Sequence, residues 1–335
     1  MTGVTGSGPW PGTDPLEAQA AVLGDLVGVP SDVTGLPFAP VLVDRRPWAD
    51  LVGRGVAMLV DLPTELGPHG WRLTARPGHD LVRARSALQA DLDALAVAAH
   101  GYTGPLVVPV LGPLSLAAVL ALAGGERVVS DPSALRDLAD SLAAGLAEHL
   151  AALVRAVPGA LPQVLLREGE LARVLAAGVP TFSGRATLRS VSREVAGSRL
   201  AAVVVAARAA GATTVAVGGG SSSSMIGPVV DAAADAVVLE VDGVNEHGWE
   251  TVAEAVEQGM RLWAEVPPPG QDARPDGAAA ADALIRPWRR VGLPAAGLAD
   301  AVLVAPPTGV WTPEGARAAL AHTVTAARIV AEAAA

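Results

Sequence analysis

The chain contains no cysteine and no lysine among its 335 residues. The absence of cysteine excludes disulfides, thiol nucleophiles and thiolate metal ligands. The absence of lysine excludes Schiff-base chemistry and the lysine of a phosphate-binding P-loop. Every basic side chain is an arginine or a histidine, so a reaction in this protein must use other groups.

Aromatic residues make up only 3% of the chain, and its formal net charge is −10. A nucleic acid calls for a basic face and often for aromatic stacking, so neither DNA nor RNA is an expected partner. No apolar run reaches the roughly 20 residues of a membrane span, and residues 1–12 lack the features of a secretory signal. We expect a cytoplasmic protein that acts on a small-molecule metabolite without a membrane, and a homo-oligomer is compatible with this composition.

Short apolar stretches alternate with segments of helical spacing along the chain. Strands that are apolar throughout are typical of a parallel sheet covered on both faces. Eight such units predict an α/β fold in which residues 1–335 form a single (β/α)8 TIM barrel, with an open doubly wound sheet as the alternative. The expected strands are Val4–Gly8, Pro40–Asp44, Leu106–Val110, Val164–Leu166, Thr213–Val217, Ala236–Val241, Leu262–Val266 and Ala301–Val304.

Helix starts are marked by favourable capping residues. Asp14 and Pro15 suit the N-cap and first position of a helix over Leu16–Leu26. The stretch Trp71–Thr74 is short and bounded by glycine and proline, so we expect it outside the main sheet. Further helices are expected at Ala49–Leu59, Asp80–Ala99, Pro132–Val154, Glu194–Ala210 and Pro313–Ala333.

The most informative stretch runs from Thr213 to Met225, where a buried strand leads into three glycines and four serines. Gly218, Gly219 and Gly220 permit positive φ and let a ligand approach the backbone. With Ser221 they could cradle a phosphate or carboxylate on amide groups. The alternative is a plain turn in which one of the serines caps the next helix.

Acidic groups follow the strand Ala236–Val241. Glu240 and Asp242 precede Glu246 and His247, and a carboxylate with an imidazole could act as acid and base or as a weak metal site. The alternative is that Glu240 lines the barrel mouth while Glu246 and His247 cap the following helix.

Several motifs together resemble the C-terminal catalytic barrel of cobalamin-independent methionine synthase, in particular a short actinobacterial branch without the N-terminal half. The resemblance covers nearly the whole chain and implies the (β/α)8 barrel shared with uroporphyrinogen decarboxylase. The implied reaction is methyl transfer from a methylated folate to homocysteine, whose sulfur a zinc ion holds as thiolate. The motifs are Gly8–Pro15, Gly112–Leu116, Gln163–Leu171, Ala236–Asp242 and Val304–Gly309.

The resemblance also implies a damaged zinc site. The family's His-x-Cys falls on Gly218-Gly219-Gly220, its glutamate on Glu240, and its last cysteine on or beside Thr308. Three of four ligands are thus replaced, whereas a zinc site normally takes three or four protein donors. We therefore expect no cofactor here.

The amino-acid pocket departs from the family as well. The family's Asp-Glu-Pro becomes Arg167-Glu168-Gly169, which reverses the charge that meets a substrate ammonium, and a further substrate glutamate falls on Arg45. Arg167 and Glu168 could instead bind an anionic ligand, or each could form a salt bridge with a neighbouring loop.

These features predict a methionine-synthase-like methyltransferase barrel whose zinc-dependent activity is lost or altered, a candidate pseudoenzyme of methionine biosynthesis. Glu240 is the residue expected to carry residual chemistry. The alternative is a non-catalytic barrel that binds a small anion or another protein.

Overall fold

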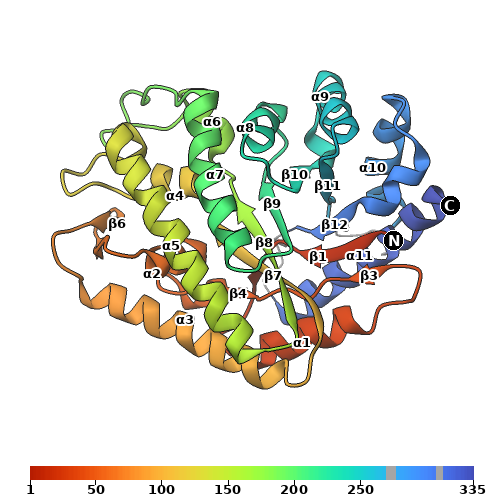
Figure 1. Cartoon of the computed structure of the whole chain (residues 1–335), viewed down its shortest axis with the longest axis horizontal. Helices are drawn as coiled ribbons and strands as arrows, with labels where there is room; N and C mark the ends of the chain where they lie inside the picture. The colour runs from red at the N-terminus through yellow and green to blue at the C-terminus, as the bar shows by residue number, and fades with distance from the viewer. Residues whose placement is uncertain (269–276, 307–311) are drawn as a thin grey trace.

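The structure of the chain, a computed structural model, describes residues 1–268, 277–306 and 312–335. A curled parallel sheet occupies the centre, helices surround it, and the two termini lie on the same side of the molecule (Figure 1). The strand order in the sheet is β3-β1-β12-β11-β10-β9-β8-β7, so strands that follow one another along the chain are mostly neighbours. The strands are β1 (Gly3–Gly6), β3 (Thr34–Gly35), β7 (Gly104–Leu111), β8 (Ala160–Arg167), β9 (Thr214–Gly218), β10 (Ala236–Glu240), β11 (Arg261–Glu265) and β12 (Val302–Ala305).

Residues 34–39, which we call the closing segment, join the two edges of this sheet. At one end β3 pairs with β1, and at the other Phe38 forms a parallel bridge with Val107 in β7. The amide of Ala39 donates to the Val107 carbonyl at 2.8 Å, and the Val107 amide donates to the Pro37 carbonyl at 2.7 Å. The sheet is therefore a TIM-barrel-like ring rather than an open doubly wound sheet.

The predicted second strand, Pro40–Asp44, is wrong as a barrel strand. Its residues Val41 and Leu42 form β4 (Val41–Leu42), which pairs with β2 (Pro9–Trp10) in a separate two-stranded sheet. The ring is closed by the residues just before it, where Gly35 and Pro37 weaken the local strand signal. Hydrogen bonding from both neighbouring strands overrides that weak propensity.

Helices cover the outside of the ring and bury their apolar faces against it. The long amphipathic helices α3, α5, α7 and α11 match the predicted ones to within a few residues. The two short helices α4 and α6, which follow β7 and β8, were not predicted. The helices are α1 (Pro15–Val27), α2 (Leu51–Met58), α3 (His79–Ala98), α4 (Pro113–Val119), α5 (Pro132–Ala156), α6 (Leu171–Leu175), α7 (Arg193–Ala209), α8 (Ile226–Asp231), α9 (Glu246–Glu257), α10 (Ala278–Arg290) and α11 (Pro313–Ala334).

One hairpin lies outside the ring, as the sequence predicts for Trp71–Thr74. The strands β5 (Thr64–Gly67) and β6 (Gly70–Leu73) pair antiparallel and project beside α2 and α3 (Figure 1). Among the described residues, no helix has both the length and the apolar character that a bilayer crossing needs.

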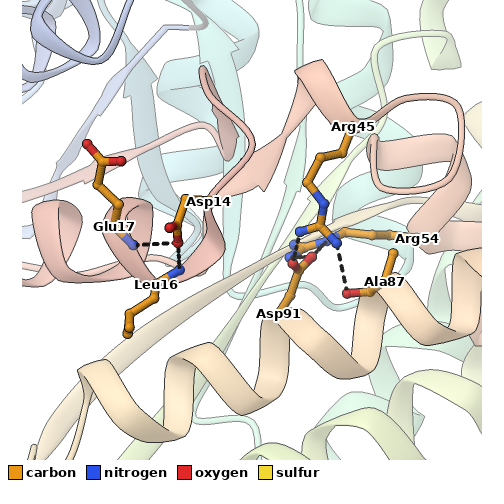
Figure 2. Close-up of polar contacts among 7 residues, drawn as sticks. All are labelled: Asp14, Leu16, Glu17, Arg45, Arg54, Ala87 and Asp91. Atoms are coloured by element: carbon orange, nitrogen blue, oxygen red, sulfur yellow. Dashed lines mark hydrogen bonds and ion pairs between the residues drawn. The ribbon is translucent and has the colours of Figure 1, made fainter.

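The cap of α1 gives a first expected result. The Asp14 carboxylate accepts hydrogen bonds from the amides of Leu16 (2.8 Å) and Glu17 (3.1 Å) (Figure 2). Pro15 occupies the first turn. Asp14→Ala leaves these amides without the cap and should lower the free energy of unfolding by about 1 kcal/mol. Urea denaturation measures the loss, and Asp14→Asn, which keeps an accepting oxygen, should lose much less.

Candidate functional site

The strand ends form a polar layer at one mouth of the ring. Residues in register on parallel strands point to the same face, and Glu240 is in register with Glu265, Glu265 with Val304, and Val304 with Thr5. Arg167 and Gly218 are in register with each other, at a level two residues before Glu240 along the strands. The sheet thus brings two acids and one arginine from three strands to the same mouth.

An ion pair between Arg167 and Glu265 spans this mouth. The two guanidinium nitrogens Nη1 and Nη2 each lie 3.2 Å from a carboxylate oxygen of Glu265, in a bidentate arrangement. The side chains are 13% and 1% exposed, respectively. Because β9 and β10 lie between β8 and β11, the contact crosses the interior of the ring. Arg167 thus forms a salt bridge with a distant strand, not with a neighbouring loop.

Gly218 and Gly219 lie next to Arg167. The Gly218 residue carries no side chain at the level of Arg167, and a Cβ built on Gly219 would lie 3.6 Å from Nη2 of Arg167. The guanidinium therefore lies beside Gly219, the middle one of the three glycines on which the resemblance places the family's His-x-Cys motif.

Glu240 ends β10 next to this ion pair and is exposed to solvent. Partial burial of its carboxyl raises its pKa, the negative charge of Glu265 raises it further, Arg167 opposes the shift, and Asp242 adds to it. Glu265 already accepts hydrogen bonds from Arg167 with both of its oxygens, whereas the Glu240 carboxylate remains available to a ligand or a proton.

Glu168 is completely buried and lies on the side of α4. One carboxyl oxygen accepts from the Leu114 amide at 3.0 Å, and the other accepts from the Ser115 amide at 2.7 Å and the Ser115 hydroxyl at 2.6 Å. Burial raises the pKa of Glu168 to about 7, although these three donors lower it. The predicted salt bridge of Glu168 is therefore wrong, because its partners are the start of α4.

This buried carboxyl predicts a pH effect on stability. The folded-state pKa of about 7 lies above the ordinary value of 4.5, so the folded chain holds this proton more tightly than the unfolded chain. The resulting stabilisation is complete below pH 4.5 and is lost as the pH rises through 7, by at most about 3 kcal/mol. Denaturation at pH 5 and pH 8 should show wild type losing stability relative to Glu168→Gln; a difference that does not change with pH contradicts the assignment.

The three glycines at the end of β9 have the positive φ values that the sequence predicts, but they do not form an open row of donors. Gly218, Gly219 and Gly220 have φ values of 149°, 140° and 90°. The amide of Gly219 donates to the Val238 carbonyl at 3.1 Å, so it is engaged and is not a free donor for an anion. The predicted anion-binding role of the Gly219 amide is therefore wrong, because this amide pairs with β10.

Gly220 is bonded to β10 as well, through its carbonyl. That carbonyl accepts a hydrogen bond from the Glu240 amide at 3.0 Å, and Gly220 is half-buried. A Cβ built on Gly220 would meet no atom within 4 Å, so the residue faces open space rather than a wall of the mouth. The contact fixes Gly220 beside Glu240, while its predicted role as a ligand contact remains a prediction.

The serines that follow do not cap a helix as predicted. A 3-10 turn over Ser223–Met225 leads into α8, and no serine side chain caps either element. The hydroxyl groups of Ser222 and Ser224 lie 2.9 Å apart and bond to each other. Ser221 packs against Gly243, and its role as a ligand contact remains a prediction.

Glu246 and His247 do not join Glu240 in a cluster at the mouth. Asn245 caps α9, Glu246 begins it, and the ring of His247 lies 3.0 Å from Glu250 on its exposed surface. Among residues 1–268, 277–306 and 312–335, no three histidine, cysteine or acidic side chains are grouped to hold a metal ion. Thr308 lies outside the described residues.

Arg45 contacts helix α3 and does not reach the barrel mouth through any contact that the structure shows among its described residues. It ends a 3-10 turn over Val43–Arg45 and donates to Asp91 in α3 and to the Ala87 carbonyl (Figure 2). Arg54 of α2 donates to the other oxygen of Asp91 through Nε at 3.2 Å and Nη2 at 2.7 Å. One buried carboxylate therefore holds two arginines from two different elements.

The sequence prediction missed Glu265 and two buried polar atoms. The hydroxyl of Thr5 and the indole N–H of Trp263 are buried and have no hydrogen-bond partner within the part of the chain that the structure describes. Thr5 lies at the register level of Glu240 and Glu265, and Trp263 lies two residues before Glu265 on the same strand face. The polar character of the interior thus extends below the ion pair.

The ring and its polar strand ends define an α/β barrel of the TIM type, and the ion pair between Arg167 and Glu265 spans its mouth. Its fold is similar to that of a B12-independent methionine synthase from Shewanella sp. W3-18-1, solved in complex with selenomethionine, with a TM-score of 0.55. The sequences are 13% identical, and the match covers 99% of this chain and 97% of the other. At this identity the likeness is one of fold.

A second solved structure is much less similar. The carboxyl transferase domain of Rhizobium etli pyruvate carboxylase matches with a TM-score of 0.27 and 11% identity, over 72% of this chain and 44% of that one. This likeness is too weak to bear on function. No protein-family model and no curated protein matches the sequence.

Proposed function

We propose that this protein is a methionine-synthase-like barrel in which zinc-dependent methyl transfer is lost or altered. The observation that carries the proposal is the bidentate contact between Arg167 and Glu265 beside Glu240. A guanidinium is a fixed positive charge, and it lies where a metal cation would need donor atoms instead.

The residues present do not fit a zinc ion. Gly218, Gly219 and Gly220 offer no side-chain donor, and Glu265 already gives both of its oxygens to Arg167. Glu240 alone falls short of the three or four donors that zinc takes. Without a metal, a bound thiol keeps its proton near neutral pH, and the two nearby carboxylates disfavour the thiolate.

A small polar ligand is nevertheless compatible with the mouth. Glu240 offers a partly desolvated carboxyl, and the buried Thr5 hydroxyl lies in the same register layer without a partner in the described chain. An anion would have to compete with Glu265 for Arg167, so we expect the ligand to bind through Glu240.

Metal analysis of the purified protein tests the first part of the proposal. We expect zinc well below one equivalent per chain after incubation with the ion and desalting, and stoichiometric zinc would overturn the proposal. Thermal denaturation with homocysteine, methyl-folate and small phosphates tests the second part. A stabilising metabolite whose effect disappears in Glu240→Gln but persists in Glu250→Gln supports a retained ligand site, since Glu250 lies on the exposed face of α9. If no metabolite stabilises the chain, a non-catalytic barrel is the better description.

A further inference from the structure

A cavity of about 240 Å³ lies outside the ring, between the β5–β6 hairpin and two loops. We call it the hairpin cavity, and the side chains that matter for its chemistry are His69, Arg72, Arg127 and Phe182, with Gly125 in its wall. No part of the catalytic resemblance falls on these residues. We propose that the hairpin cavity binds a small aromatic carboxylate.

Backbone contacts hold the cavity walls together. The Leu73 amide donates to the Ala121 carbonyl at 2.7 Å, and the Ala121 amide donates to the Trp71 carbonyl at 3.0 Å, which ties the hairpin to the loop after α4. The second loop is tied to the first because the Phe182 amide donates to the Glu126 carboxylate at 3.0 Å. Three segments that are distant in sequence thus form the walls of one cavity.

Arg127 supplies the positive charge of the cavity. Its side chain is half-buried and donates to the Val119 carbonyl, but it forms no ion pair with a carboxylate in the described part of the chain. Arg72, which forms a backbone bridge to Ala121 as Arg127 does, is neutralised by Glu65 through a 2.8 Å hydrogen bond. A half-buried guanidinium without an acidic partner favours an anionic group, and a carboxylate can bind it through two oxygens.

The aromatic side chains define the other end of the ligand. The rings of His69 and Phe182 meet edge to face, with centroids 5.4 Å apart at 82°. Phe182 is 57% exposed, whereas Phe38, the other phenylalanine, is 2% exposed. A Cβ built on Gly125 would be in van der Waals contact with the Phe182 ring at 3.4 Å, so Gly125 packs closely against one part of that ring. An aromatic ring placed against the part of Phe182 that remains exposed would bury apolar surface.

The size of the cavity restricts the ligand to a small molecule. Its 240 Å³ lies below the roughly 300–1,000 Å³ of pockets that hold drug-sized ligands. A single ring with one carboxylate matches this volume and the guanidinium of Arg127, which has no carboxylate partner among the described residues.

Titration calorimetry of the full chain with benzoate tests the proposal. We expect saturable binding of benzoate, no comparable binding of benzylammonium, which has the ring but the opposite charge, and weaker binding of inorganic phosphate, which lacks the ring. Arg127→Gln should weaken benzoate binding on the order of tenfold or more. The control Arg136→Gln removes an arginine that is 54% exposed on α5 and should leave the affinity unchanged.

Arg127→Gln also removes the hydrogen bond to Val119 and could destabilise the fold. A second variant therefore tests the proposal independently. Phe182→Leu changes a largely exposed ring, retains apolar bulk and should weaken benzoate binding severalfold. Glu240→Gln, at the barrel mouth, should not affect it, so this result is independent of the proposed function. Absence of saturable benzoate binding, equal binding of benzylammonium, or full affinity in Phe182→Leu would each overturn the proposal.

Discussion

Replacing Arg167 by methionine is expected to lower the free energy of unfolding by about 3–5 kcal/mol. The variant removes the partner of Glu265, which is 1% exposed, and leaves its charge buried and unpaired. Removal of one member of a buried ion pair usually costs more than the pair itself contributes. Equilibrium denaturation in urea measures the loss.

The double variant Arg167→Met with Glu265→Met separates this cause from a loss of packing. Apolar side chains of similar volume can replace a buried ion pair at little or no cost, so the second change should recover most of the stability. As a matched control, Arg173→Met breaks the exposed pair with Glu170 and should cost at most about 1 kcal/mol. A single variant as stable as this control would refute the role assigned to Arg167.

Asp91→Asn should also destabilise the chain by about 3–5 kcal/mol. Asp91 is 4% exposed and is the carboxylate that Arg54 and Arg45 share (Figure 2). The amide keeps the size of the side chain but removes the charge, which leaves two guanidiniums without their counter-ion. Because Arg45 is 18% exposed and can turn towards water, most of the loss is expected from Arg54.

Asp93→Asn provides the control for this prediction. Asp93 lies on the same helix α3, is exposed, and accepts a hydrogen bond from Gln89. Denaturation of both variants should show a large loss for Asp91→Asn and a change within about 0.5 kcal/mol for Asp93→Asn. Similar losses for the two would mean that the α2–α3 contact does not depend on the buried charge.

Most of the barrel is predictable from the sequence because its strands are apolar and its helices amphipathic. The strand β9, for example, appears as Thr213–Val217 in the prediction and as Thr214–Gly218 in the structure. The closing segment is not predictable in this way, since Gly35 and Pro37 are poor strand formers and the stronger local signal of Val41 and Leu42 belongs to a small outer sheet. Its position is decided by the two neighbouring strands rather than by its own residues.

The candidate site was predictable only where a single segment carries the signal. Glu240 and the glycines stand at strand ends, and the structure places them at one mouth. The ion pair was not predictable, because Arg167 and Glu265 are 98 residues apart and a lone glutamate at the end of a strand has no distinctive local pattern. Glu168 was placed at the correct strand end, but its burial against α4 depends on a short helix that the sequence does not mark.

The closing segment also determines where the ring is weakest. It pairs with β1 through two residues and with β7 through the bridge at Phe38, whereas β7 and β8 pair over eight residues. We therefore expect local unfolding to start between β1 and β7, so that in hydrogen–deuterium exchange the amide hydrogens of residues 34–39 exchange before those of β7 and β8. The ring can open at the closing segment while the ion pair between β8 and β11 remains formed.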